Sequence, residues 1–138
     1  MQLRHSRFLV LAAFAGVFAL VAAVPAFAGT SSTKATSIKV SINKTKEFAF
    51  TLSPKSAPHG VITFTVTNGG NLPHDFELCS KPSSSASATS CTGKKTALIS
   101  PGASAKLTVT VAKAGSYQYL CTVSGHAAAG MRGLLKIT

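Results

Sequence analysis

The stretch "YLCTVSGHAAAGMRG" near the end of the chain contains a cysteine, a histidine and a methionine, each five residues from the next. These residues are Cys121, His126 and Met131. A thiol, an imidazole and a thioether pack differently, but all three bind soft and borderline metal ions. The glycines and alanines between them allow a loop to fold tightly enough for the three side chains to converge. The spacing therefore predicts a metal-binding loop.

A stable metal site needs a further ligand from elsewhere in the chain. After the N-terminal segment, the other histidines are His59 and His74. His59 lies in the turn sequence "APHG", where a solvated histidine is the ordinary expectation. His74 lies between two segments of alternating apolar residues, so it is the better candidate. The predicted metal ligands are His74, Cys121, His126 and Met131.

Two imidazoles, a thiolate and a weak axial thioether are the ligand set of copper sites that transfer electrons. Cu(I) favours soft sulfur, whereas Cu(II) favours imidazole nitrogen. A rigid site that suits both states needs little rearrangement when an electron moves, with Cys121 setting its electronic character and Met131 tuning its potential. Zinc is the alternative occupant, but catalytic zinc keeps an open position that a methionine would crowd. We therefore expect one copper ion.

The elements that must position these ligands are short β-strands. Apolar and polar residues alternate in several segments separated by turns rich in glycine and proline, and helical periodicity is nearly absent. This pattern is typical of an antiparallel all-β sandwich or barrel, and we expect the sandwich. The residues on the predicted apolar faces are Ile38, Val40, Ile42, Phe48, Phe50, Leu52, Ile62, Phe64, Val66, Leu107, Val109, Val111, Tyr117, Tyr119, Cys121, Leu135 and Ile137.

Residues 1–28 have the order of a secretory signal peptide. A basic start precedes an apolar run over residues 8–24, and the small-residue sequence "AFA" follows a proline. An uncleaved membrane anchor is the alternative, but the run is short for a span and ends in a cleavage site. We expect cleavage after Ala28, a flexible leader over 29–37 and one exported domain over 38–138, in the periplasm or outside the cell.

The exported domain is strongly basic. Without Arg4 and Arg7 the chain has 12 Lys and Arg residues against three acidic residues, a formal charge of +9. The basic residues are scattered and no nucleic-acid recognition motif accompanies them, so we expect no nucleic-acid partner. The charge instead predicts steering towards redox proteins with acidic docking surfaces, with at most peripheral contact with an anionic membrane or envelope. We expect a monomer.

Three cysteines in an exported protein leave one thiol outside any disulfide. Cys79 and Cys91 flank most of a polar, Ser-rich segment over residues 80–95, which predicts a long surface loop. Joining the two cysteines would stabilise the fold by roughly 3 kcal/mol. Two free cysteines are the alternative. If the pair forms, Cys121 is the lone thiol.

The sequences "VTNGGNLPHDFEL" and "GSYQYLCTVSGHAAAGMRGLLKIT" resemble the cupredoxin family of small blue copper proteins. The resemblance covers most of residues 38–138. The Cys-x4-His-x4-Met spacing resembles auracyanin-type members more than the shorter plastocyanin loop. The resemblance implies an all-β, antiparallel Greek-key β-sandwich in which copper is held by His74, Cys121, His126 and Met131.

The resemblance also implies roles for neighbours of the ligands. In this family the second loop histidine exposes a ring edge within an apolar patch and passes the electron there. Around His126 this assigns the patch to Ala127, Ala128 and Ala129. The family often has an asparagine after the first histidine, whereas this chain has Asp75. We expect the Asp75 carboxylate to accept a hydrogen bond from the Thr122 amide or hydroxyl and to favour the oxidised metal.

These observations predict an exported type 1 (blue) copper protein that is a mobile one-electron carrier between redox partners. Copper storage or delivery would call for a Met/His-rich stretch, and Met131 is the only methionine after Met1. A cupredoxin-like domain that has lost its metal is the other alternative. We expect no enzymatic activity, because copper enzymes of this fold need further histidines and no Ser-His-Asp, paired-carboxylate or Gly-rich phosphate motif is present.

Overall fold

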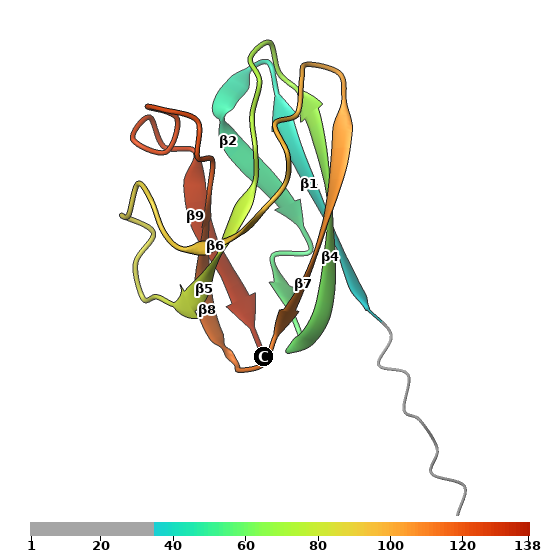
Figure 1. Cartoon of the computed structure of the whole chain (residues 1–138), viewed down its shortest axis with the longest axis vertical. Coiled ribbons are helices and arrows are strands. Elements are labelled where there is room, and N and C mark those ends of the chain that lie inside the picture. Colours follow the sequence, from blue (N-terminus) through green and yellow to red (C-terminus); the bar gives the residue numbers. More distant parts are fainter. Residues whose placement is uncertain (1–34) are drawn as a thin grey trace, which may run out of the picture. The chain divides into compact units, whose positions relative to one another are not determined.

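Nine β-strands make up the ordered framework of residues 35–138, the part of the chain that this computed structural model describes (Figure 1). The strands are β1 Thr36–Asn43, β2 Lys46–Ser53, β3 Ser56–Ala57, β4 Gly60–Gly69, β5 Glu77–Pro82, β6 Gly93–Lys95, β7 Ser104–Val111, β8 Gly115–Leu120 and β9 Arg132–Ile137. The predicted signal peptide and the predicted leader up to residue 34 lie outside the described residues.

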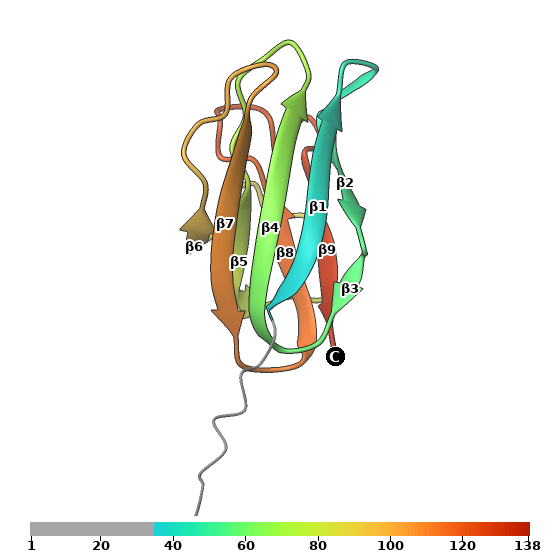
Figure 2. The same ribbon diagram turned by 90° about the vertical axis from the view of Figure 1, so that its right-hand side faces the viewer.

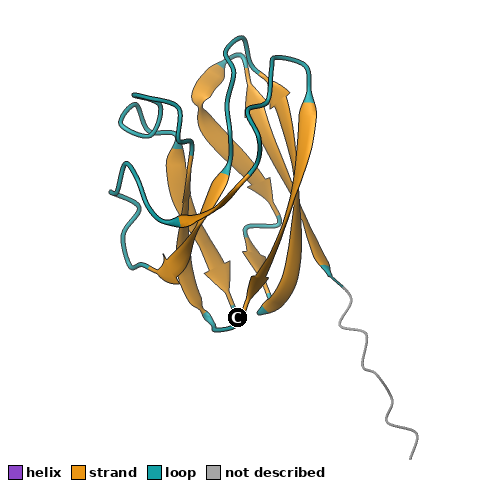
Figure 3. Ribbon diagram, viewed as in Figure 1, coloured by secondary structure: helices purple, strands orange, loops and turns teal. Residues whose placement is uncertain are grey.

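The strands form two sheets that face each other (Figures 1 and 2). One sheet has the order β2-β1-β4-β7 and the other the order β3-β9-β8-β5-β6, so the chain crosses repeatedly from one sheet to the other. Residues 35–138 contain strands and loops but no helix (Figure 3). The predicted all-β sandwich is confirmed.

A membrane-spanning helix is not found among the residues that the structure describes.

The core between the sheets consists of the side chains that the alternation placed on apolar faces. Ile38, Ile62 and Phe64 are each 0% exposed. Strands β1 and β4 are neighbours, so their apolar faces lie side by side on the inner surface of one sheet. The buried residues of the predicted faces are Ile38, Val40, Ile42, Leu52, Ile62, Phe64, Val66, Leu107, Val109, Val111, Tyr117, Cys121, Leu135 and Ile137.

Two of the strand pairs are parallel. Strand β1 runs parallel to β4, with Ile38 opposite Phe64 and Val40 opposite Val66, and β3 runs parallel to β9. Period-two alternation shows which face of a strand is buried, but it does not show the direction of the neighbouring strand. The sheets are therefore mixed, although antiparallel pairs predominate.

The boundaries of two predicted segments differ from the structure. Strand β1 begins at Thr36, so residues 36 and 37, which were predicted to belong to the leader, are part of a strand. The predicted loop over 80–95 is wrong at both ends, because Ser80 to Pro82 continue β5 and Gly93–Lys95 form β6. These polar residues pair through their backbones, for example Ser80 N to Thr92 O at 2.9 Å, and such bonds do not depend on apolar side chains.

The disulfide between Cys79 and Cys91 is confirmed. It joins β5 to the end of the Ser-rich loop, 12 residues further along the chain. Gly93 follows at the start of β6, where a Cβ atom would lie 2.1 Å from the Leu78 carbonyl oxygen. A residue without a side chain therefore allows the closed loop to pair with β5.

Candidate metal centre

Three predicted ligands meet at one end of the sandwich. The Nδ1 atoms of His74 and His126 are 3.1 Å apart, and the Sγ atom of Cys121 lies 3.6 Å from His126 Nδ1 and 4.0 Å from His74 Nδ1. An ion with zinc-like bond lengths to two imidazoles and a thiolate in one plane would separate these donors by about 3.5–3.8 Å. The observed triangle therefore fits one ion with little movement of the side chains.

The loop between β8 and β9 brings Cys121 and Met131 together. The Cys121 amide donates to the Met131 carbonyl oxygen at 3.0 Å, and the Met131 amide donates to the His126 carbonyl oxygen at 3.0 Å. Strands β8 and β9 are antiparallel neighbours, with Leu120 opposite Arg132, so the two ends of the loop are adjacent. Cys121 and Met131 are both 0% exposed. All four predicted ligands therefore lie at the same end of the domain.

His74 is held by the backbone of a neighbouring segment. Its amide donates to the Ile99 carbonyl oxygen at 3.1 Å, and the Ile99 amide donates to the His74 carbonyl oxygen at 2.7 Å. This isolated bridge fixes the backbone of a residue whose side chain is fully buried. His74 is therefore positioned by tertiary contacts rather than by a strand of its own.

His126 is the ligand that reaches towards the surface. It is partly exposed, and its ring packs edge-on against Phe48 at a centroid distance of 5.1 Å. Its partial burial, followed by the proximity of His74, lowers the pKa of His126. A neutral imidazole is the form that binds a metal. His126 therefore combines a ligand atom facing inward with a ring that lies near solvent.

Burial raises the pKa of the Cys121 thiol to about 11. The metal-free thiol is therefore protonated at neutral pH, and a metal ion must displace that proton because the thiolate is the ligand.

The Asp75 carboxylate is hydrogen-bonded to the residue that follows Cys121. Its Oδ1 atom accepts from the Thr122 amide at 2.6 Å, and its Oδ2 atom accepts from the Thr122 hydroxyl. The expected contact therefore forms through both groups. Lys95, which sequence reasoning missed, donates to Thr122 Oγ1 at 2.9 Å and lies 3.5 Å from Asp75 Oδ2. The carboxylate thus has a cationic partner next to the site.

We predict that Asp75→Asn raises the reduction potential of the copper-loaded protein. The substitution removes a negative charge beside Cys121 that favours the oxidised metal. Because Lys95 already offsets part of this charge, we expect a modest change, about 1–2 kcal/mol or about 40–85 mV. Redox titration of both proteins measures it. An unchanged or lower potential in the variant would contradict the assignment of Asp75.

The predicted alanine patch is only partly at the surface. Ala127 is 3% exposed and packs against Cys79 and Leu120, so its assignment to the patch is wrong. Its burial follows from the folding of the loop, in which the Gly130 amide donates to the Ala127 carbonyl oxygen at 3.1 Å. Ala128 and Ala129 are exposed.

Two larger apolar side chains near the site are exposed, which the sequence did not predict. Phe48 is 39% exposed and contacts His126, although the alternation placed it on the apolar face of its strand. Leu72, two residues before His74, is 41% exposed. Phe48 lies near the start of β2, an edge strand of its sheet, where its ring contacts His126 on one side and solvent on the other. The loops, rather than the strand pattern, decide its environment.

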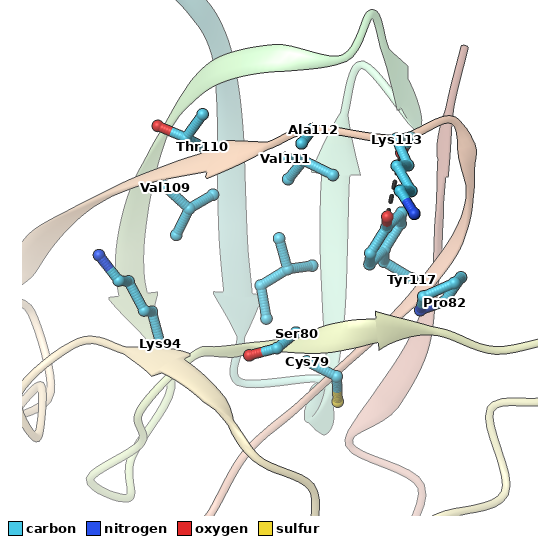
Figure 4. Close-up of a pocket in the computed structure, with 11 residues that line it drawn as sticks. Cys79, Ser80, Pro82, Lys94, Val109, Thr110, Val111, Ala112, Lys113 and Tyr117 are labelled. Atoms are coloured by element: carbon cyan, nitrogen blue, oxygen red, sulfur yellow. Dashed lines mark hydrogen bonds between the residues drawn. The ribbon is translucent and has the colours of Figure 1, made fainter.

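A cavity of about 480 Å³ lies between β7 and β5, away from the metal ligands (Figure 4). Its apolar lining includes Leu78, Val109, Val111 and Tyr117. None of the four predicted ligands lines this cavity. The metal centre lies elsewhere, where the donor atoms of His74, Cys121 and His126 converge.

Comparison with known proteins agrees with this geometry. The family described as "Copper binding proteins, plastocyanin/azurin family" matches residues 36–138. The chain belongs to this family, the cupredoxins, and the cofactor of its site is copper. No curated protein matches the chain in sequence.

Solved structures of cupredoxins share the fold. Reduced auracyanin from Roseiflexus castenholzii is 22% identical, with a TM-score of 0.59 over 75% of this chain and 98% of that protein. Auracyanin B is 24% identical, with a TM-score of 0.61 over 75% and 89% of the two chains. Rusticyanin from Thiobacillus ferrooxidans is 22% identical, with a TM-score of 0.57 over 78% and 79%. The predicted cupredoxin resemblance is confirmed.

Proposed function

We propose that this chain is an exported type 1 copper protein that carries single electrons between redox partners. The observation that carries the proposal is the triangle of donors from buried His74, buried Cys121 and partly exposed His126, with Met131 buried beside it. Bound copper supplies the one-electron chemistry by alternating between Cu(I) and Cu(II). Export rests on the signal-like order of residues 1–28.

The chain itself holds the ligands rigidly and leaves one of them, His126, near the surface, where an electron can pass to a partner. His74 is fixed by the bridge to Ile99, and Cys121 by its bond to the Met131 backbone. Ligands held in this way need not rearrange between oxidation states. His126 is the partly exposed ligand, and its ring contacts the exposed Phe48 ring, so these two side chains connect the site to solvent.

The surface charge of residues 35–138 favours an acidic partner. Its three acidic side chains, Glu47, Asp75 and Glu77, are largely or fully turned inward, the last two being 5% and 6% exposed. The lysines are all exposed, and they are Lys39, Lys44, Lys46, Lys55, Lys81, Lys94, Lys95, Lys106, Lys113 and Lys136. Positive charge is therefore almost unopposed at the surface, which supports steering towards an acidic redox protein.

The function is tested by loading the purified protein with Cu(II) and following its visible and electron paramagnetic resonance spectra during redox titration. We expect an intense thiolate-to-copper band that bleaches on uptake of one electron per protein and returns on reoxidation. A protein that loses its metal on each cycle would be a storage or delivery protein instead. A colourless protein that binds zinc or no metal would overturn the carrier proposal.

We predict that the association rate with an acidic redox protein falls about 10-fold when ionic strength rises from about 10 mM to about 500 mM. Salt screens the attraction between the lysines and the partner's carboxylates. Stopped-flow measurement of electron transfer at several salt concentrations gives the rate, and a partner without net charge is the control. A flat profile with the acidic partner contradicts the steering proposal.

A further inference from the structure

The carboxylate of Glu47, near the start of β2, lies directly behind the His74 ring. Its Oε1 atom accepts hydrogen bonds from His74 Nε2 and from the Leu72 amide, both at 2.9 Å. The Asn71 amide donates to both carboxylate oxygens at 2.9 Å. The Glu47 side chain is 14% exposed. A single carboxylate thus holds the ring of a metal ligand and the backbone that leads to it.

The segment before His74 is shaped to receive this carboxylate. A Cβ atom at Gly70 would lie 2.3 Å from Glu47 Oε1, so a side chain there would displace the carboxylate. The fully buried Asn68 supports the same segment, because its Nδ2 atom donates to the carbonyl oxygens of Leu72 and Ile99, each at 2.8 Å. The "NGGN" sequence therefore helps to form a binding site for the Glu47 carboxylate and is not only a turn between strands.

The bond to Glu47 determines which nitrogen of His74 is free. A carboxylate accepts hydrogen bonds, so Nε2 carries the proton and Nδ1 keeps its lone pair. Nδ1 is the atom that faces His126 Nδ1 at 3.1 Å and Cys121 Sγ at 4.0 Å. The same carboxylate accepts from the Asn71 and Leu72 amides, so three N–H donors converge on it, and such donors stabilise its anionic form.

We propose that Glu47 is a positioning residue of the copper site, which holds His74 in its metal-binding tautomer and stabilises Cu(II) relative to Cu(I). The inference rests on the proposed copper function. A carboxylate bonded to the far nitrogen of an imidazole ligand makes that ligand more basic, and loss of such a partner typically costs 10–100-fold in metal affinity. The negative charge favours the more highly charged ion, so Glu47 lowers the reduction potential.

The first test compares the affinities of the purified protein and Glu47→Gln for Cu(II) and Cu(I). The variant keeps the shape of the side chain and removes its charge. We expect Cu(II) affinity to fall about 10–100-fold with Cu(I) affinity nearly unchanged, which raises the potential by about 59–118 mV. Equal losses for both ions, or an unchanged potential, would mean that Glu47 only braces the loop, and would overturn the proposal.

Glu77→Gln is the matched control. Glu77 is also a buried carboxylate, 6% exposed, but no hydrogen bond joins it to His74 or His126 among the described residues. We expect its potential shift to be less than a third of that of Glu47→Gln. An equal shift in the two variants would show a general effect of lost charge and would overturn the assignment to the His74 contact.

The second test needs no copper. Nitrogen NMR of the metal-free protein identifies the protonated nitrogen of His74. We expect the Nε2–H tautomer in the wild-type protein and a mixture of tautomers in Glu47→Ala. An unchanged tautomer in a folded Glu47→Ala protein overturns the positioning role. Failure of the wild-type protein to bind copper would instead overturn the proposed function, so the two failures are distinguishable.

Discussion

Replacing Cys121 by serine is expected to give a colourless protein. Cys121 supplies the thiolate that faces both histidine Nδ1 atoms, and it is the one cysteine not joined in the disulfide. The visible band arises from charge transfer between thiolate and copper, so its loss should be complete. Loss of a residue that is hydrogen-bonded to a metal ligand lowers metal affinity roughly 10–100-fold. Because Cys121 is itself a ligand, we expect its replacement to lower Cu(II) affinity by more than this. Visible spectroscopy and competition with a chelator measure both effects.

The double variant Cys79→Ser, Cys91→Ser is the matched control for this loss. It removes two sulfur atoms and the disulfide but leaves the ligand set intact. We expect it to remain blue while its folding stability falls by roughly 3 kcal/mol. A Cys121→Ser protein that keeps the band, or a control that loses it while still folded, would contradict the assignment of the ligand.

The second large effect is on stability, and we expect it for Phe76→Ala. Phe76 is 0% exposed, and its ring contacts those of Phe64, Phe50 and Tyr119 at centroid distances of 5.0, 5.2 and 5.6 Å. Truncation leaves a cavity between the two sheets, so the free energy of unfolding should fall by about 3–5 kcal/mol. Urea denaturation of the metal-free protein measures it.

Phe48→Ala provides the comparison for Phe76. Phe48 has the same side chain but is 39% exposed at the edge of the metal site, so we expect less than half of the loss in unfolding free energy. Equal losses in the two variants would mean that Phe76 is not a main part of the core.

Much of the fold was predictable because strand patterns are local. The alternation of Ile38, Val40 and Ile42, and that of Ile62, Phe64 and Val66, correctly indicated the faces that are buried. The parallel pairing of β1 with β4 was not predictable, because the same alternation suits either direction of the neighbouring strand. Polar residues such as Ser80 were misplaced in a loop because their pairing depends on backbone groups alone.

The ligand set was also determined by the sequence alone. Cys121, His126 and Met131 lie within one short loop, so their spacing carries the information, and His74 stood out because so few histidines are present. The confirmed disulfide had a similarly local reason, the polar loop between Cys79 and Cys91.

Only the tertiary structure decided what surrounds the ligands. Glu47 reaches His74 across 27 residues, and Lys95 reaches Thr122 across 27, through sheet and loop contacts that no local pattern reports. Ala127 is buried for the same reason, since it packs against Cys79 and Leu120. A metal ligand is recognisable by its own chemistry, whereas a charge or an apolar side chain acquires a role only from the neighbours that folding brings to it.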